Sequence, residues 1–159
     1  MLIDDIRTYV VRPSLQCASL WTQAAEVLLV GTILVETGAE HLMQVHGSAY
    51  GLYQIEHDTH KETKVWLSNR MNKNMIDRVL ATCCMAMLPS DDEPLVYNLR
   101  YATLIARIIY YRNKNPLPAA QDASAMAEFH KMVYNTAKGK ADPVKNTPIF
   151  QRVIDESID

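Results

Sequence analysis

Residues 28–59 read LLVGTILVETGAEHLMQVHGSAYGLYQIEHDT, and this stretch decides the fold. Its apolar first part ends on a single carboxylate, Glu36. Fifteen residues later Gly51 begins the segment GLYQI, and Thr59 follows. A carboxylate at the end of a buried helix is unfavourable unless a partner or a function uses its charge. We therefore expect Glu36 to face a cleft, with Gly51 and Gln54 in one of its walls.

The composition favours one mainly helical domain. A chain of 159 residues can form a single domain with a well-buried core. Long β-branched alternation is missing, whereas Ala, Leu, Met and Ile recur at helical spacing. The segment over residues 23–36 is apolar on nearly all sides, which is typical of a central helix. We expect a single all-α domain over residues 1–159, built round this helix.

Several flanking segments are also predicted to be helical. A short amphipathic helix over residues 3–11 should break at Arg12-Pro13, because the residue before a proline disfavours the α region. Further amphipathic patterns predict helices over residues 75–87, 95–112, 122–134 and 148–154.

Charge, cysteines and the N-terminus argue against several classes of protein. The formal net charge is −2 and the basic residues are scattered, so a nucleic-acid-binding protein is not expected. Cys17, Cys83 and Cys84 are odd in number and two are adjacent, which favours reduced thiols. The N-terminus does not have the pattern of a signal peptide. The longest apolar run, residues 27–35, is about half a membrane span. We expect synthesis in the cytoplasm without a signal peptide, and no membrane span.

Glu36 with its neighbour Thr37, together with the segment GLYQI, has a counterpart in a known family. Glu36-Thr37, followed at the same interval by residues 51–55 and then Thr59, resembles the catalytic region of soluble lytic transglycosylases. That family has Glu-Ser, then Gly-Leu-Met-Gln-x, then a Thr. Identity and spacing agree in this part of the chain.

Two later motifs fall in the same order as in that family, where an Asn opens a long helix and an Ala-Tyr-Asn motif follows. Here Asn98 and the sequence VYN at residues 133–135 take those places, so the resemblance covers residues 24–135. The segment YNTAKGK at residues 134–140 is similar to a phage or prophage subgroup of this lysozyme-like fold, which also includes goose-type lysozymes.

The resemblance implies cleavage of the β-1,4 bond between N-acetylmuramic acid and N-acetylglucosamine in peptidoglycan. The leaving oxygen needs a proton from a carboxylic acid that stays protonated in apolar surroundings, and Glu36 follows three apolar residues. The 2-acetamido group of the substrate can stabilise C1, so one carboxylate can suffice. Glu36 would then act as base on the 6-hydroxyl and leave a 1,6-anhydro end. No cofactor is implied.

The same resemblance assigns the substrate-binding residues. Gly51 would let the backbone approach the sugar closely. Gln54 would hydrogen-bond sugar or acetamido groups, and Tyr134 would hold or polarise the Glu36 carboxyl. Asn98 and Asn135 are expected to contribute further contacts.

Three positions depart from the family pattern. Thr37 stands in place of Ser and keeps the hydroxyl group. Tyr53 stands in place of Met and adds an aromatic ring that could stack on a sugar. Val133 stands in place of Ala. None of these changes removes the acid, so we expect activity.

Each of these residues also has a purely structural interpretation. Glu36 could be a solvated helix terminus, and Gly51 with Gln54 could form a simple turn. Tyr134 could be a core tyrosine, and Asn98 only a helix-start residue.

A second carboxylate would change the expected reaction. Glu40, Glu56 and Asp58 are the candidates, although each is also a typical solvated surface residue. If one of them faced Glu36 across about 6.5–9.5 Å, an inverting hydrolysis of the goose-lysozyme type would become possible.

The remaining alternatives concern metals and non-catalytic roles. His57 and His60 lie three residues apart, whereas zinc-binding helices usually place two histidines four apart, so no metal site is predicted. A non-catalytic virion component or sugar-binding module could keep the same fold. The expected partners are peptidoglycan glycan strands and other phage virion proteins, and the expected place of action is the bacterial cell wall or periplasm.

Overall fold

The computed structural model describes residues 2–44, 47–134 and 141–157, and it is mainly helical, which confirms the all-α prediction. Two short strands pair antiparallel. In chain order the elements are α1 (Ile3–Asp5), the π-helical η1 (Ile6–Val11), α2 (Arg12–Cys17), α3 (Gln23–Thr37), β1 (Ala49–Tyr50), β2 (Ile55–Glu56), α4 (His57–Leu67), the 3-10 helix η2 (Arg70–Asn72), α5 (Lys73–Thr82), α6 (Pro94–Tyr97), α7 (Leu99–Tyr111), α8 (Ala123–Val133) and α9 (Pro143–Asp155).

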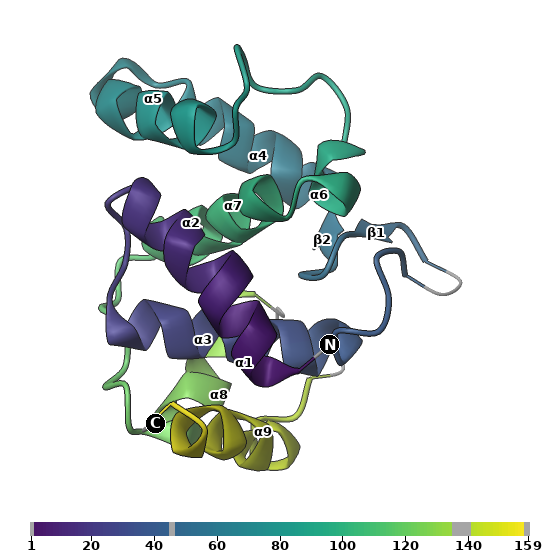
Figure 1. Ribbon diagram of the computed structural model, residues 1–159, viewed down its shortest axis with the longest axis vertical. Coiled ribbons are helices and arrows are strands. Elements are labelled where there is room, and N and C mark those ends of the chain that lie inside the picture. Colours follow the sequence, from purple (N-terminus) through teal and green to yellow (C-terminus); the bar gives the residue numbers. More distant parts are fainter. Residues whose placement is uncertain (1, 45–46, 135–140, 158–159) are drawn as a thin grey trace.

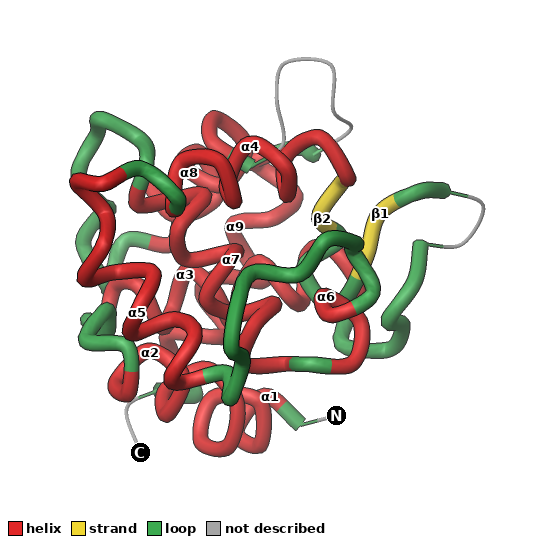
Figure 2. Tube along the Cα trace, turned by 90° about the horizontal axis from the view of Figure 1, so that it is seen from above, coloured by secondary structure: helices red, strands yellow, loops and turns green. Residues whose placement is uncertain are grey.

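The helices form two groups that α7 joins (Figure 1). Helices α4 and α5 lie at one end of the molecule, and both contact α7. Helices α8 and α9 lie at the other end, where α9 packs against α8 and α3. The β1–β2 hairpin projects from one side, as the view from above also shows (Figure 2). The end of α3 therefore lies close to where the hairpin meets the helices.

Helix α3 is the central helix that the sequence predicts. Thr22 caps its N-terminus by accepting a hydrogen bond from the Ala25 amide, at 3.0 Å. Gly38 ends it in the left-handed conformation. Residues 27–33 are all buried. A Cβ at Gly31 would lie 2.2 Å from the Phe150 ring, so glycine is what allows α9 to approach α3 this closely.

The N-terminal end of α3 carries a buried carboxylate whose charge is fully paired. Arg12 donates two hydrogen bonds of 2.8 Å to Glu26, and the Trp21 indole donates a third of 2.7 Å. The hydrogen bond with Glu26 raises the pKa of Arg12. Arg7 lies 3.3 Å from Glu26 and donates to the Val153 carbonyl near the end of α9. These contacts fix the N-terminal helices and α9 to α3.

The break predicted at Arg12-Pro13 is wrong. Arg12 adopts the α conformation, and helical structure continues through α2 to Cys17. Pro13 lies in the first turn of α2, immediately after the π-helical η1. A proline is tolerated in a first turn, where its missing N–H is needed least.

Three predicted helix boundaries also differ from the structure. The helix predicted over residues 95–112 is divided, because Asn98 is extended and separates α6 from α7. Helix α5 stops at Thr82 instead of continuing to residue 87, and Cys84 then takes a positive φ of 55° that no helix accommodates. Helix α9 begins at Pro143, earlier than residue 148, because Asp142 caps it by accepting from the Val144 amide at 3.0 Å.

A buried carboxylate, Asp92, joins the connector before α6 to α4. It lies 2.6 Å from Nδ1 of His57 and 2.6 Å from Nδ1 of His60. An ionised carboxylate only accepts hydrogen bonds, so both nitrogens donate, and Nε2 of His60 accepts from the Tyr101 hydroxyl at 2.8 Å. Burial lowers the pKa of His60. Burial alone would raise the pKa of Asp92, but its hydrogen bonds with the two histidines outweigh this effect and lower it.

We expect the free energy of unfolding to fall as the pH drops below about 6.5, the ordinary pKa of histidine. The folded state keeps His60 neutral because its pKa is lowered, whereas the unfolded chain takes up the proton at the ordinary pKa. The stabilisation is therefore complete at higher pH and is lost on acidification. Urea unfolding between about pH 7.5 and about pH 5 measures this slope. His60→Gln should flatten it, and His41→Gln, a change at an exposed histidine, should leave it unchanged.

Candidate active site

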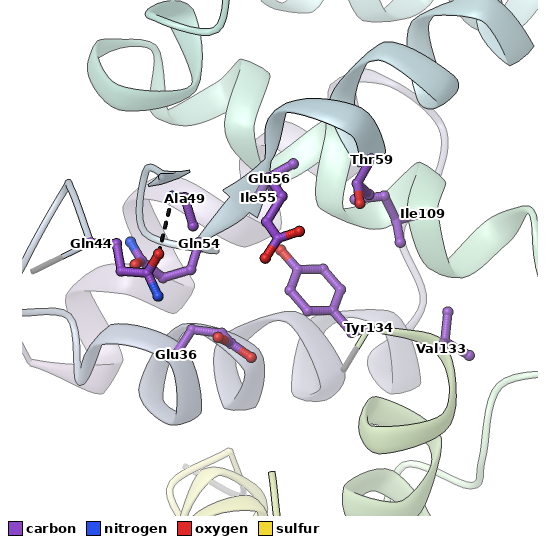
Figure 3. Close-up of a pocket in the computed structure, with 10 residues that line it drawn as sticks. All are labelled: Glu36, Gln44, Ala49, Gln54, Ile55, Glu56, Thr59, Ile109, Val133 and Tyr134. Carbon is purple, nitrogen blue, oxygen red and sulfur yellow. Dashed lines mark hydrogen bonds between the residues drawn. The ribbon is translucent and has the colours of Figure 1, made fainter. Parts of the chain in front are cut away.

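A cavity of about 270 Å³ opens at the C-terminal end of α3 (Figure 3). Its walls come from α3, the hairpin region, the first turn of α4, α7 and the end of α8. The structure thus brings together Glu36, Gln54 and Tyr134, the three predicted catalytic and substrate-binding residues that line the cavity, although they are far apart in the chain. The lining residues are Glu36, Gln44, Ala49, Gln54, Ile55, Glu56, Thr59, Ile109, Val133 and Tyr134.

Glu36 reaches the cavity from the last turn of α3, and its side chain is 16% exposed. Its Oε1 lies 2.9 Å from Nε2 of His130, a fully buried residue on α8. An ionised Glu36 carboxylate only accepts hydrogen bonds, so in that state Nε2 of His130 donates. Glu36 is therefore a carboxylate that is held at one oxygen and faces a partly enclosed space.

Thr37 lies next to Glu36 but does not line the cavity. It is buried, and its hydroxyl donates to the carbonyls of Ile33, at 3.0 Å, and Leu52, at 3.1 Å. The second bond joins the end of α3 to the segment that begins at Gly51. Thr37 consequently positions the cavity wall, and its hydroxyl is not directed at a ligand.

Glycine is needed at position 51 because the backbone there packs closely against another part of the chain. The sequence predicts that Gly51 approaches a sugar, and the geometry does not show this. Its φ is +74°, and a Cβ there would lie 2.1 Å from the Leu95 carbonyl oxygen. The close neighbour is thus the chain at α6. Gly51 is absent from the residues that line the cavity within the described part of the chain.

The Tyr53 ring does not offer the stacking surface expected from the sequence. It is completely buried, and its hydroxyl donates to Thr103 at 3.0 Å. Burial raises the pKa of Tyr53. Its backbone carbonyl accepts a hydrogen bond from the Tyr134 hydroxyl. Tyr53 therefore acts as a core residue, because the adjacent α7 supplies both apolar surface and a hydroxyl partner.

Tyr134 lines the cavity, but its hydroxyl donates to the Tyr53 carbonyl and not to Glu36, contrary to the expected role. Its ring stacks on Tyr110, with 5.4 Å between ring centroids, and on His130, at 5.7 Å. Burial raises the pKa of Tyr134 well above its ordinary value. Its hydroxyl stays protonated near neutral pH, and the ring forms one wall.

Gln54 is the member of the segment at residues 51–55 whose polar side chain lines the cavity. Its amide nitrogen donates to the Gly51 carbonyl at 2.8 Å, which leaves the side-chain oxygen to accept from a ligand. Its φ of 48° lies in the left-handed region, which is uncommon for a residue other than glycine. Such strain of about 1–3 kcal/mol is concentrated at functional sites.

One expected contact, Asn98, lies outside this cavity. Asn98 caps α7, accepting from the Tyr101 amide at 3.1 Å and donating to the Cys83 carbonyl at 3.2 Å. It lines a separate surface hollow together with Tyr97 and Arg100. The helix-start interpretation therefore accounts for Asn98. Asn135 and residues 136–140 lie outside the described residues.

Of the three candidate second carboxylates, Glu56 is the one that lines the described cavity. Figure 3 shows its side chain directed from the β2–α4 junction toward the side where Tyr134 lies. Asp58 lines a different hollow on α4, and Glu40 is exposed beyond the end of α3. The cavity thus contains two carboxyl groups, one from each side.

The chemistry available at this cavity is that of carboxyl groups. Within residues 2–44, 47–134 and 141–157, no group of three or more His, Cys, Asp or Glu side chains could hold a metal ion. In the same residues, no helix combines the length and the apolar character needed to cross a bilayer. Ile55, Ile109 and Val133 add apolar surface near Glu36, which limits hydration of its carboxyl group, whereas Glu56 is exposed.

Comparison with protein-family models, with curated proteins and with solved structures gave no match. A function for this chain therefore has to be inferred from its own residues and their geometry.

His130 is the hydrogen-bond partner of Glu36, a role that the sequence analysis did not assign. Its one available signal is its position four residues before Tyr134, the C-cap of α8, which places the two side chains on the same side of the last turn. That spacing does not reveal the partner, because Glu36 lies 94 residues away in the chain.

We expect Gly51→Ala to destabilise the protein by about 3 kcal/mol or more. Alanine there would be strained at positive φ and would also collide with the Leu95 carbonyl. Gly38→Ala is the matched control, because its φ of +59° is similar but its Cβ would meet no atom closer than 3.8 Å. It should cost about 1–2 kcal/mol. Urea unfolding of both variants measures the difference, and equal losses would contradict the proposed contact.

Proposed function

We propose that this chain is a peptidoglycan lytic transglycosylase of lysozyme-like fold, with Glu36 as general acid and then base. The observation that carries the proposal is the convergence of Glu36, Gln54 and Tyr134 on one cavity at the end of a buried helix. These residues come from motifs that resemble the soluble lytic transglycosylases in identity and order.

In the first step, the protonated carboxyl of Glu36 gives its proton to the glycosidic oxygen as the bond from that oxygen to C1 breaks. The acetamido oxygen of the N-acetylmuramic acid unit bonds to C1 and takes up the developing positive charge. In the second step, the Glu36 carboxylate removes the proton of the 6-hydroxyl, and O6 displaces the acetamido oxygen from C1. A 1,6-anhydro ring forms, no water is consumed, and Glu36 is protonated again.

The size and lining of the cavity are compatible with part of a glycan strand. About 270 Å³ lies just below the range typical of small-molecule sites, so a polymer would occupy it with one unit and extend beyond it. Gln54 offers an acceptor oxygen for an amide or hydroxyl donor of the sugar. Ile55 and Ile109 offer apolar contact to a sugar face.

Glu56 favours a second candidate reaction, hydrolysis of the same bond. A carboxylate on the opposite side of the cavity could activate a water molecule while Glu36 protonates the leaving group. The reaction would then add water, and no anhydro ring would form.

Either reaction would take place at the bacterial cell wall. The similarity of residues 134–140 to a phage or prophage subgroup extends the proposal to a virion-associated enzyme that meets peptidoglycan strands and other virion proteins.

We expect Glu36→Gln to lower the rate of peptidoglycan cleavage by at least about 100-fold, since general acid–base catalysis contributes that much or more. The rate is measured as clearing of purified sacculi, with circular dichroism to check folding. Glu40→Gln is the control, because it removes an exposed carboxylate four residues along the chain and should keep full activity. Unchanged clearing by folded Glu36→Gln would reject Glu36 as the acid, whereas no clearing by the folded wild-type chain would favour a non-catalytic virion component or sugar-binding module.

The products distinguish the two reactions. We expect mass spectrometry of the released muropeptides to find 1,6-anhydro ends, and Glu56→Gln to keep most of the activity because Glu36 alone completes both steps. Water-added reducing ends, together with a loss of about 100-fold or more in Glu56→Gln, would identify a hydrolase in which Glu56 is the base.

A further inference from the structure

His130 is set up as a rigid hydrogen-bond donor to Glu36. The residue is completely buried on α8, and its Nε2 lies 2.9 Å from Glu36 Oε1. The imidazole stacks on Tyr134, with an angle of 23° between the ring planes. On another side it contacts Phe150, at 6.2 Å between centroids. Packing on both sides restricts rotation of the ring, so the direction of the Nε2–H bond is fixed.

The other ring nitrogen indicates which protonation state is favoured. Nδ1 of His130 is buried, and none of the described residues offers it a hydrogen-bond partner. A charged imidazolium would place a second N–H donor in this position with no acceptor, which costs more than leaving a neutral nitrogen there. The neutral ring with its proton on Nε2 is therefore the form that fits the site.

This form suits both states of an acid that loses and regains a proton. When Glu36 is protonated on Oε2, its Oε1 is a carbonyl oxygen and still accepts from His130. When the proton has left, the same bond becomes charge-assisted and stronger. A donor that binds more tightly as negative charge develops is the kind that accelerates a reaction.

We propose that His130 is a positioning residue for the Glu36 acid: its neutral Nε2–H holds Oε1, confines proton exchange to Oε2, and stabilises the carboxylate formed when the proton leaves. This inference rests on the proposed role of Glu36 in cleavage.

Titratable groups face Glu36 from several elements. His130 lies on α8 and Tyr134 directly after it, Glu56 lies on β2, and Tyr110 lies on α7. Burial raises the pKa of both tyrosines, so neither ionises near neutral pH.

The test compares two substitutions at position 130. His130→Gln keeps an N–H donor at nearly the same reach, whereas His130→Leu keeps volume but removes the donor. We expect His130→Leu to lower kcat by about 10- to 100-fold, as loss of a hydrogen bond to a charged group does, with KM within about twofold. The alkaline limb of its kcat–pH profile should move to higher pH, because the carboxylate form has lost its donor. His130→Gln should recover most of the activity and the original profile.

Several outcomes would overturn the proposal while leaving the role of Glu36 intact. One is an active wild-type chain, inactivated by Glu36→Gln, in which His130→Leu changes neither kcat nor the pH profile. Another is equal loss in both substitutions, which would make His130 a packing residue. An inactive wild-type chain would instead remove the proposed function, and this inference with it.

If His130→Leu does not fold, a measurement on the unsubstituted protein still tests the proposal. Nitrogen NMR of ¹⁵N-histidine-labelled protein at about pH 7 distinguishes the two neutral tautomers from the imidazolium. We expect the Nε2–H tautomer for His130. Its signal is the one that is absent from the spectrum of His130→Gln, and Glu36→Gln should shift it. An imidazolium or an Nδ1–H tautomer would overturn the proposal.

Discussion

Burial of α3 on nearly all sides is the constraint on which the rest of the structure depends, because each end of this helix carries a carboxylate. At the first end, Glu26 is buried and surrounded by Arg12, Arg7 and the Trp21 indole, so its charge is compensated inside the protein. At the other end, Glu36 lies 2.9 Å from Nε2 of His130 and remains partly exposed to a cavity. One carboxylate thus holds the fold together, and the other is left available for chemistry.

The wall opposite Glu36 is positioned by residues that do not themselves line the cavity. The Thr37 hydroxyl binds the Leu52 carbonyl, Gly51 lies against the Leu95 carbonyl, and Tyr53 anchors the segment in the core. Gln54 follows in a strained turn, and its side chain is the polar group that lines the cavity. The fifteen-residue interval between the two motifs therefore has a structural reason, since it spans the loop that returns to the end of α3.

The proposed chemistry fits this division of roles. A reaction in which the substrate supplies its own acetamido group needs one acid that can lose and regain a proton. The site offers such a group in Glu36, with a fixed donor on one oxygen and apolar walls around it. Glu56 is what makes a hydrolytic variant of the same reaction conceivable, because it brings a second carboxylate to the cavity.

The sequence by itself determined the features that depend on neighbouring residues: the all-α class and a central helix over residues 23–36, which the structure extends by one residue to Thr37. These follow from periodicity and capping, which act over a few residues. Only the tertiary structure decided that His130 binds Glu36 and that Tyr53 is buried. The reason is physical: such contacts join residues 50 or more positions apart, and the direction of a side chain depends on helices that pack around it.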